Sequence, residues 1–163
     1  MIVLGVDPGF TITGFSIVSK INGKDIILDS GCFSFSTTQS LPMKIGTFYQ
    51  KLSEKIIKYQ VTIIAIETPF LGKNVQTFLK LGYLRGVLYL LSQQHNLVLH
   101  EFSPREVKLA ITGFGGAQKE QVAKVLSLLF PQLGLVKKAD ISDAIAIGLC
   151  GLWKRNPCHS FFK

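Results

Sequence analysis

The sequence has few cysteines, no long apolar run and few acidic residues. Its three cysteines, Cys32, Cys150 and Cys158, are odd in number and lack C-x-x-C spacing, which argues against a disulfide framework and a zinc site. Cys32 and Cys150 lie among apolar neighbours, so we expect buried thiols there. The longest apolar stretch, residues 83–91, is interrupted by an arginine and a glycine. It falls well short of the roughly 20 apolar residues that a membrane-spanning helix needs.

The length and the N-terminal residues suggest one cytoplasmic domain. Residues 1–6 are apolar but have no basic lead, unlike a signal peptide. We see neither an internal repeat nor a linker in the 163 residues, which suit one domain by size. We therefore expect a single domain over residues 1–163, with a flexible tail from about residue 156.

Acidic residues are scarce, which makes their positions informative. The chain has 18 lysines and arginines against 10 aspartates and glutamates, a formal charge of +8. Such an excess suits a polyanion such as nucleic acid, because each phosphate neutralised by lysine or arginine releases bound counterions. Many basic proteins bind no nucleic acid, so the charge alone leaves this question open.

The pattern of apolar residues predicts a mixed α/β domain. Three strands over residues 2–6, 13–19 and 25–35, with Asn22-Gly23 as a turn pair, predict an antiparallel meander. From residue 41 the apolar residues recur at steps of three and four, which predicts an amphipathic helix over 41–59. A buried parallel strand over 61–66 then ends at Glu67, and a helix over 75–94 capped by Asn74 and a strand over 97–102 follow it. A capping box at Ser103-Pro104-Arg105-Glu106 marks the start of the next helix, and a glycine-rich break follows at 112–116. The last two predicted helices are over 117–131 and 140–153. We expect one mixed β-sheet, an antiparallel meander plus parallel strands, flanked by helices.

Four acidic residues lie where two strands end and where the last helix begins. Asp7 ends the first strand before a Pro-Gly turn, and Glu67 ends the buried strand. Ligands bind at the carboxyl ends of parallel strands, so these two acids meet at one sheet edge if their strands are neighbours. Asp140 and Asp143 are three apart on a predicted helix and therefore share a face.

Gathered carboxylates point to divalent metal, although each acid also has an ordinary structural explanation. Close anions stay ionised only beside a compensating charge, and hard cations such as Mg²⁺ take oxygen ligands. Two ions about 3.5–4 Å apart can activate a water and stabilise the leaving oxygen at a phosphodiester. Alternatively, Asp7 suits a turn and Glu67 a solvated loop, while Asp140 and Asp143 suit the cap and first turn of a helix.

Several motifs resemble those of one known family in their order and spacing. They are Gly5-Val-Asp-Pro-Gly9 with Thr13-Gly14, Ala65-Ile-Glu67 with Phe70 and Lys73-Asn74, Leu79-Lys-Leu-Gly82 with Arg85-Gly-Val87, Val107-Lys108 with Gly113-x-Gly115-x-Ala117-x-Lys119-x-Gln121-Val122, and Asp140-x-x-Asp143-Ala144-x-Ala146. Together they resemble the RuvC family of Holliday-junction resolvases, of the RNase H-like superfamily, from Gly5 to about Cys150. The chain departs from the family at Phe10 and Thr11, where many relatives carry polar or basic residues, and at Gly116, where relatives often have a small polar residue.

The resemblance implies a homodimeric endodeoxyribonuclease that acts in recombination and repair. Such an enzyme binds four-way DNA junctions and cuts two strands of like polarity symmetrically. The resemblance further implies that Asp7, Glu67, Asp140 and Asp143 are catalytic and ligate Mg²⁺, with Mn²⁺ able to substitute and two ions in each active site. The RuvA and RuvB branch-migration proteins are usual partners of the family.

Residues near the acids suggest contacts with DNA. Phe70 follows a proline, where its ring can stack on an unpaired base for about 1–3 kcal/mol or else simply fill the core. Lys108 and Lys119 flank the glycine-rich loop, and either can hold the scissile phosphate or lie on a solvated helix face. We expect Lys119 to be catalytic as well as DNA-binding. Lys73 and Asn74 complete the expected DNA-binding set.

Two glycines suggest a close helix contact. Gly82 and Gly86 are four apart on one face of a predicted helix, where another backbone can approach closely. Packing within the monomer is the default explanation. A helix from a second subunit is the other.

Three other functions fit parts of the pattern. An ATPase of the sugar-kinase and actin superfamily also begins with a strand, Asp-x-Gly and a hairpin, but it needs a second domain and a second phosphate loop. A non-catalytic junction-binding protein on the same fold would have its acids lost or blocked, and all four are present here. An RNase H-like nuclease that acts on another nucleic acid is the alternative that the sequence excludes least.

Overall fold

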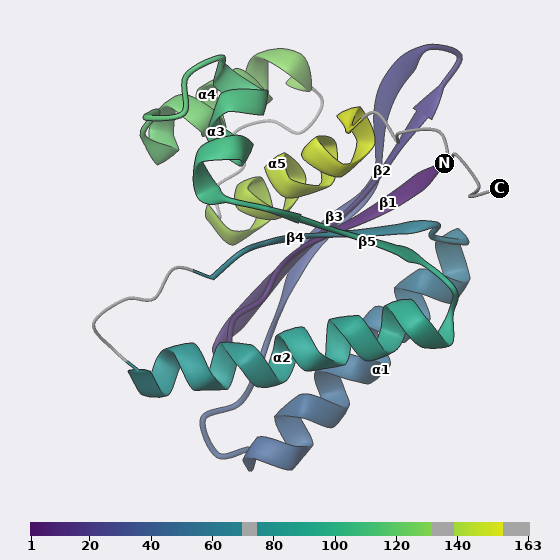
Figure 1. Ribbon diagram of the computed structural model, residues 1–163, viewed down its shortest axis with the longest axis vertical. Coiled ribbons are helices and arrows are strands. Elements are labelled where there is room, and N and C mark those ends of the chain that lie inside the picture. The colour runs from purple at the N-terminus through teal and green to yellow at the C-terminus, as the bar shows by residue number, and fades with distance from the viewer. Residues whose placement is uncertain (70–74, 132–138, 155–163) are drawn as a thin grey trace, which may run out of the picture.

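The computed structural model describes residues 1–69, 75–131 and 139–154 (Figure 1). Its elements are β1 (Ile2–Asp7), β2 (Ile12–Ile21), β3 (Lys24–Ser34), α1 (Leu41–Tyr59), β4 (Ile63–Glu67), α2 (Val75–Gln94), β5 (Val98–Phe102), α3 (Pro104–Thr112), α4 (Lys119–Leu129) and α5 (Ala139–Trp153). The predicted order of elements is confirmed, and α1 has the predicted bounds. Strands β1 and β2 are longer than predicted and β3 is shifted by one residue at the same length, whereas β4 starts two residues later and α4 is shorter at both ends.

Local sequence explains where several elements begin and end. The turn between β2 and β3 has positive φ at both Asn22 and Gly23, the backbone that an Asn-Gly pair favours. The predicted capping box at the start of α3 is present, because Ser103 and Glu106 each bond the other's backbone amide. Helix α4 begins later than expected, at Lys119, where the backbone amide of Gln118 donates to the side-chain oxygen of Gln121 at 2.8 Å and so fixes the helix start.

The five strands form one mixed sheet in the order β3-β2-β1-β4-β5. Strands β1, β2 and β3 pair antiparallel, which confirms the meander, and β1, β4 and β5 pair parallel. The register of β1 on β4 runs from Val3 opposite Ile63 to Val6 opposite Ile66. Two segments some sixty residues apart in the chain therefore end side by side at one edge of the sheet.

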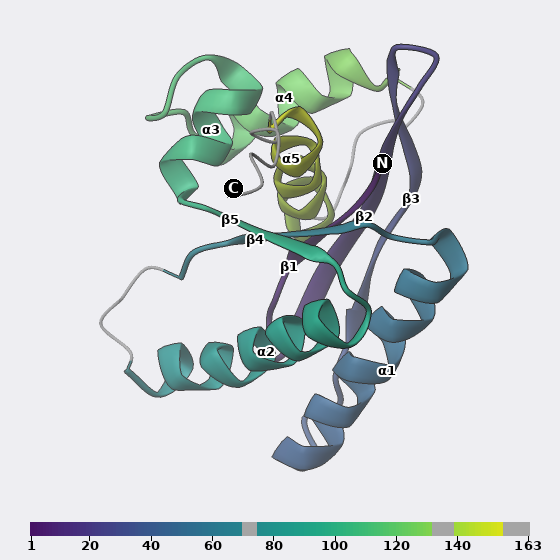
Figure 2. The same cartoon turned by 45° about the vertical axis from the view of Figure 1, so that its right-hand side comes forward.

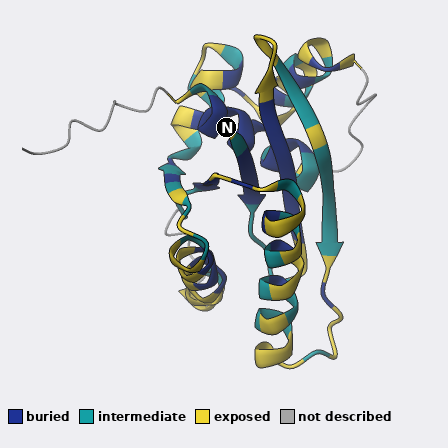
Figure 3. Ribbon diagram, turned by 90° about the vertical axis from the view of Figure 1, so that its right-hand side faces the viewer, coloured by how far each residue is buried: buried dark blue, intermediate teal, exposed yellow. Residues whose placement is uncertain are grey.

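Helices cover both faces of the sheet, so the domain has three layers (Figures 1 and 2). Helices α1 and α2 bury residues such as Phe48 and Leu88 against one face, with Leu4, Val6 and Ile66 of the sheet. Helix α5, flanked by α3 and α4, covers the other face and contributes a second core. Figure 3 shows the buried residues along the sheet and the inner helix faces, with exposed residues on the outer faces.

Of the two cysteines expected to be buried, Cys150 is buried and Cys32 is only partly buried. Cys150 is buried in α5, and burial raises the pKa of its thiol to about 12. Cys32 is half-buried, because β3 is the outermost strand of the meander. Cys158 lies outside the described residues. Among the helices in the described ranges, none is long and apolar enough to cross a membrane.

Candidate active site

The ends of β1 and β4 bring Asp7 and Glu67 to the same sheet edge. Val6 and Ile66, one residue earlier on each strand, belong to the core beneath α1 and α2. Because successive side chains on a strand alternate between faces, Asp7 and Glu67 project toward the opposite layer, where α5 lies. Both acids are half-buried.

The first turns of α5 supply the next acids. Helix α5 lies very close to the meander here, because a Cβ on Gly14 would collide with the backbone carbonyl of Asp140. Ser16 fixes this approach by donating its hydroxyl to the carbonyl oxygen of Ala144 at 2.7 Å. Asp143, one turn after Asp140, thereby comes to lie over the ends of β1 and β4.

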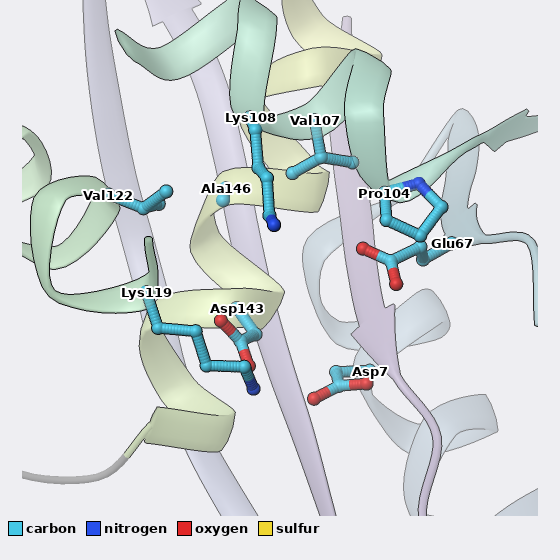
Figure 4. A pocket seen from close by; sticks show the side chains of 9 residues that line it. All are labelled: Asp7, Glu67, Pro104, Val107, Lys108, Lys119, Val122, Asp143 and Ala146. Atoms are coloured by element: carbon cyan, nitrogen blue, oxygen red, sulfur yellow. The ribbon is translucent and has the colours of Figure 1, made fainter. Parts of the chain in front are cut away.

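One pocket collects the acids and two lysines (Figure 4). Its volume is about 250 Å³, and it is lined by Asp7, Glu67, Pro104, Val107, Lys108, Lys119, Val122, Asp143 and Ala146. Figure 4 shows the carboxylates of Asp7, Glu67 and Asp143 directed into a common hollow, with the two lysine side chains entering from α3 and α4. Residues from five different elements therefore meet there, as β1, β4, α3, α4 and α5 each contribute.

The lysines partly balance the negative charge. Lys119 donates to Oδ2 of Asp143 at 2.9 Å, and this hydrogen bond is the main cause that raises the pKa of its amine. The Lys119 side chain is otherwise 71% exposed, so the ion pair is open to solvent. Lys108 is half-buried on α3 and its charge acts to lower the pKa of Glu67.

Burial and crowding disfavour the ionised acids. Burial is the largest cause that raises the pKa of Asp7, which reaches about 7, and the charges of Asp143, Glu67 and Asp140 raise it further while Lys119 opposes them. The pKa of Glu67 is also raised, first by burial and then by the charge of Asp143. A group of carboxylates whose charge is suppressed in this way would gain from a bound cation.

The donor set suits a hard divalent cation. The described residues that line the pocket offer carboxylate oxygens and no soft ligand, which is the set that Mg²⁺ and Mn²⁺ prefer. Within the described ranges, however, no three acidic, histidine or cysteine side chains already lie close enough together to hold an ion. Lys119 bonds only Oδ2 of Asp143, so Oδ1 of the same carboxylate is the oxygen that can ligate a metal without loss of this partner.

Some of the expected site residues lie elsewhere. Asp140 does not line the pocket, although its charge still acts on Asp7 from the start of α5. The predicted DNA-binding residues Phe70, Lys73 and Asn74 lie outside the described residues.

Arg85, for which we predicted no role, is connected to the site in the structure. Arg85 is 8% exposed and donates to the backbone carbonyl oxygen of Glu67 at 2.8 Å. The signal available in the sequence was an arginine within an otherwise apolar stretch of helix, since buried arginines need partners.

A mixed sheet of this order, with acids gathered where β1 and β4 end, is the architecture of the RNase H-like fold. The chain belongs to the RuvC family, because the family model described as crossover junction endodeoxyribonuclease RuvC matches residues 3–151. Relatives of that name are 40% identical over 93% of this chain and 80% of the protein in Pelodictyon phaeoclathratiforme, and 42% over 93% and 79% in Chlorobium chlorochromatii.

Solved structures share the fold. A structure of Thermus thermophilus RuvC superposes with a TM-score of 0.83 at 24% identity, and it covers 92% of each chain. A structure of T. thermophilus RuvC in complex with Holliday junction substrate superposes with a TM-score of 0.82 at 21% identity, again over 92% of each chain. The expected RNase H-like architecture is therefore confirmed.

Proposed function

We propose that this protein resolves four-way DNA junctions by metal-dependent hydrolysis of two phosphodiester bonds. The observation that carries the proposal is the pocket in which Asp7, Glu67 and Asp143 meet two lysines. Membership of the RuvC family supports the junction as substrate, because the relatives are named for crossover junctions. The formal charge of +8 suits a DNA partner.

We propose Mg²⁺ as the cofactor, with Mn²⁺ able to substitute and two ions in each active site. Asp7, Glu67 and Asp143 would hold the ions, with Asp140 at the edge of the set. When bound, such ions supply a water of lowered pKa and stabilise charge on the leaving oxygen. The acids themselves would orient the ions, and the buried side chains of Val107 and Val122, which line the pocket, would limit access of bulk water.

The lysines and the segment after β4 would bind the DNA. Lys108 and Lys119 reach the pocket from α3 and α4 and suit the non-bridging oxygens of a scissile phosphate (Figure 4). We propose that Lys119 transfers its bond from Asp143 to that phosphate on DNA binding. Phe70 would stack on an unpaired base, with Lys73 and Asn74 contacting the backbone nearby.

We further propose a homodimer that pairs through α2. Four large apolar residues of α2 are about half exposed, Val75 (60%), Leu79 (55%), Tyr83 (49%) and Leu90 (50%). Their spacing places them along one helical face with Gly82 and Gly86. A Cβ on either glycine would meet none of the described residues within 4 Å, which supports the alternative of a helix from a second subunit over packing within the monomer. Two active sites on a symmetric dimer would suit symmetric cutting.

The setting of the reaction is also a proposal. Chromosomal junctions in bacteria lie in the cytoplasm, and the bacterial relatives support that location here. RuvA and RuvB would be the partners that move the junction to a preferred cutting sequence.

A cleavage assay on three substrates tests the proposal. We expect the wild type, with Mg²⁺ or Mn²⁺, to cut four-way junctions but not linear duplex or an RNA–DNA hybrid. Asp7→Asn and Glu67→Gln should lose cleavage by orders of magnitude and keep junction binding, because the amides retain shape but not charge. Glu54→Gln, the same loss of charge on the exposed face of α1, is the matched control and should cut normally.

The outcomes separate the alternatives. Equal cutting of all three substrates would identify a different RNase H-like nuclease. If the wild type binds junctions but fails to cut any of several sequences, the protein is a binding module.

A further inference from the structure

A buried arginine ties helix α2 to the strand end that carries Glu67. Arg85 donates through Nη1 to the Glu67 carbonyl oxygen at 2.8 Å and through Nη2 to Oε2 of Glu101 at 2.8 Å. Nη2 also donates to the Tyr89 hydroxyl at 3.0 Å, and that hydroxyl donates to the other oxygen of Glu101. One guanidinium thus links α2 with β4 and β5.

The arginine reaches Glu67 from the layer opposite to its carboxylate. Residues 84, 87 and 88 of α2 pack in the core on the α1–α2 face, and Arg85 lies among them. The Glu67 side chain projects to the other face, into the acidic pocket. Arg85 therefore cannot act as a ligand or contact a substrate there. It holds the backbone from which the Glu67 carboxylate extends.

At its end, β4 is no longer paired with β1 on one side. The pairing of β4 with β1 ends at Ile66, so Glu67 lies one residue past it. On the other side Thr68 donates its amide to the Phe102 carbonyl at 2.7 Å, which continues the contact with β5. Arg85 supplies a separate bond to Glu67, directly behind the acid.

A second network in the same layer has nearly the same design but no strand-end contact. Lys55 and Tyr59 are four apart on α1, as Arg85 and Tyr89 are on α2, and both bond Oδ2 of Asp29, at 2.6 and 2.9 Å. In each network a basic residue and a tyrosine on one helix bond an acidic residue on a strand. The Lys55 network lies on β3, at the far side of the sheet from β4.

We propose that Arg85 is a positioning residue for Glu67, and that Glu101 and Tyr89 in turn fix the guanidinium. This inference rests on the metal-dependent cleavage proposed above. An arginine suits the task because its planar group offers several fixed donors, whereas a lysine offers one nitrogen on a flexible stem. Arg85 bonds the backbone carbonyl oxygen of Glu67 and not its carboxylate, so its contribution is geometric.

The test compares Arg85→Lys, Arg85→Met and the matched control Lys55→Met. Three measurements are made on each: Mn²⁺ binding to the DNA-free protein by calorimetry, thermal unfolding in EDTA, and single-turnover cleavage as a function of Mn²⁺ concentration. Removing a residue that orients a metal ligand typically weakens metal affinity about 10- to 100-fold. We expect at least about a tenfold loss of Mn²⁺ affinity for Arg85→Lys, with the melting temperature close to that of the wild type.

The control separates positioning from general stability. Lys55→Met should lower the melting temperature while Mn²⁺ affinity and the metal dependence of cleavage stay as in the wild type. Wild-type Mn²⁺ affinity in Arg85→Lys would overturn the inference, as would an equal loss of affinity in Lys55→Met. Should Arg85→Met fail to fold, Arg85→Lys still decides. A wild type that neither binds Mn²⁺ nor cuts refutes the proposed function instead.

Discussion

At the scale of single residues, Asp7 shows a conflict between stability and the proposed chemistry. The residue is placed where burial and three neighbouring acids oppose its charge, and its pKa rises from 3.8 to about 7. A position chosen for stability alone would favour a neutral side chain. The acidic pocket is thus a part of the molecule where a bound cation would remove a cost of folding.

This conflict predicts how the metal-free protein responds to pH. Because the folded-state pKa is raised, Asp7 keeps a proton on folding that the unfolded chain has released between pH 3.8 and about 7. The contribution of Asp7 to the free energy of unfolding is therefore fully present below pH 3.8 and is lost as the pH rises to about 7. The raised pKa of Glu67 acts in the same direction.

We expect Asp7→Asn to melt at a higher temperature than the wild type in EDTA, by a margin that widens as the pH rises from about 4 to about 8. Thermal unfolding across that range is the measurement. Mg²⁺ should narrow the margin by stabilising the wild type only. A margin independent of pH would contradict the environment described for Asp7, and Glu54→Gln should show none.

At the scale of elements, the contact of α5 with the sheet determines the site. Helix α5 approaches β1 and β2 through glycines on both partners. A Cβ on Gly148 would lie 2.5 Å from the Ser16 hydroxyl oxygen, and one on Gly5 would lie 2.5 Å from the Gly148 amide nitrogen. Gly14 meets the carbonyl of Asp140 in the same way. Without these glycines Asp143 could not reach the strand ends.

Gly14→Ala should therefore damage both fold and site. The added methyl group must displace the backbone at the start of α5, and overpacking of this kind costs about 1–3 kcal/mol or more. We expect a lower free energy of unfolding in urea and weaker Mn²⁺ binding. Gly46→Ala is the control, because a Cβ there meets nothing within 4 Å and alanine favours the α1 helix by up to about 1 kcal/mol. Equal stability of the two variants would be inconsistent with the close approach of α5.

Elements were more predictable from sequence than the contacts between them. Periodicity and caps predicted α1, the Asn22-Gly23 turn and the Ser103 capping box, since these depend on residues a few positions apart. From the sequence we could say only that Asp7 and Glu67 meet if their strands are neighbours. The sequence did not predict that β1 and β4 pair. The bond from Lys119 to Asp143 and the role of Arg85 were not predictable, because both arise from partners distant in the chain.

At the scale of the whole molecule, the outer face of α2 is an exposed apolar surface that packing within one chain does not explain. Its inner face packs in the core, and its outer face is also apolar along four turns, so the helix is apolar nearly all round. Helices of that kind are usually buried on both sides. A second copy of the chain would supply the missing cover.

Leu79→Glu tests the proposal that two copies of the chain pair through α2. A charge in a buried helix pair is strongly unfavourable, so we expect this variant to sediment as a monomer at micromolar concentration while the wild type sediments as a dimer. Leu128→Glu, at a leucine on α4 that is 72% exposed, should remain dimeric. A monomeric wild type would refute the dimer.

The sheet order has a consequence for protein synthesis. Asp7 is synthesised before Glu67, but the pocket is incomplete until α5, the last element described, docks on β1 and β2. Incomplete chains would thus carry the first acids without the rest of the pocket. Any cutting activity would therefore begin only after α5 has docked and brought Asp143 to the pocket.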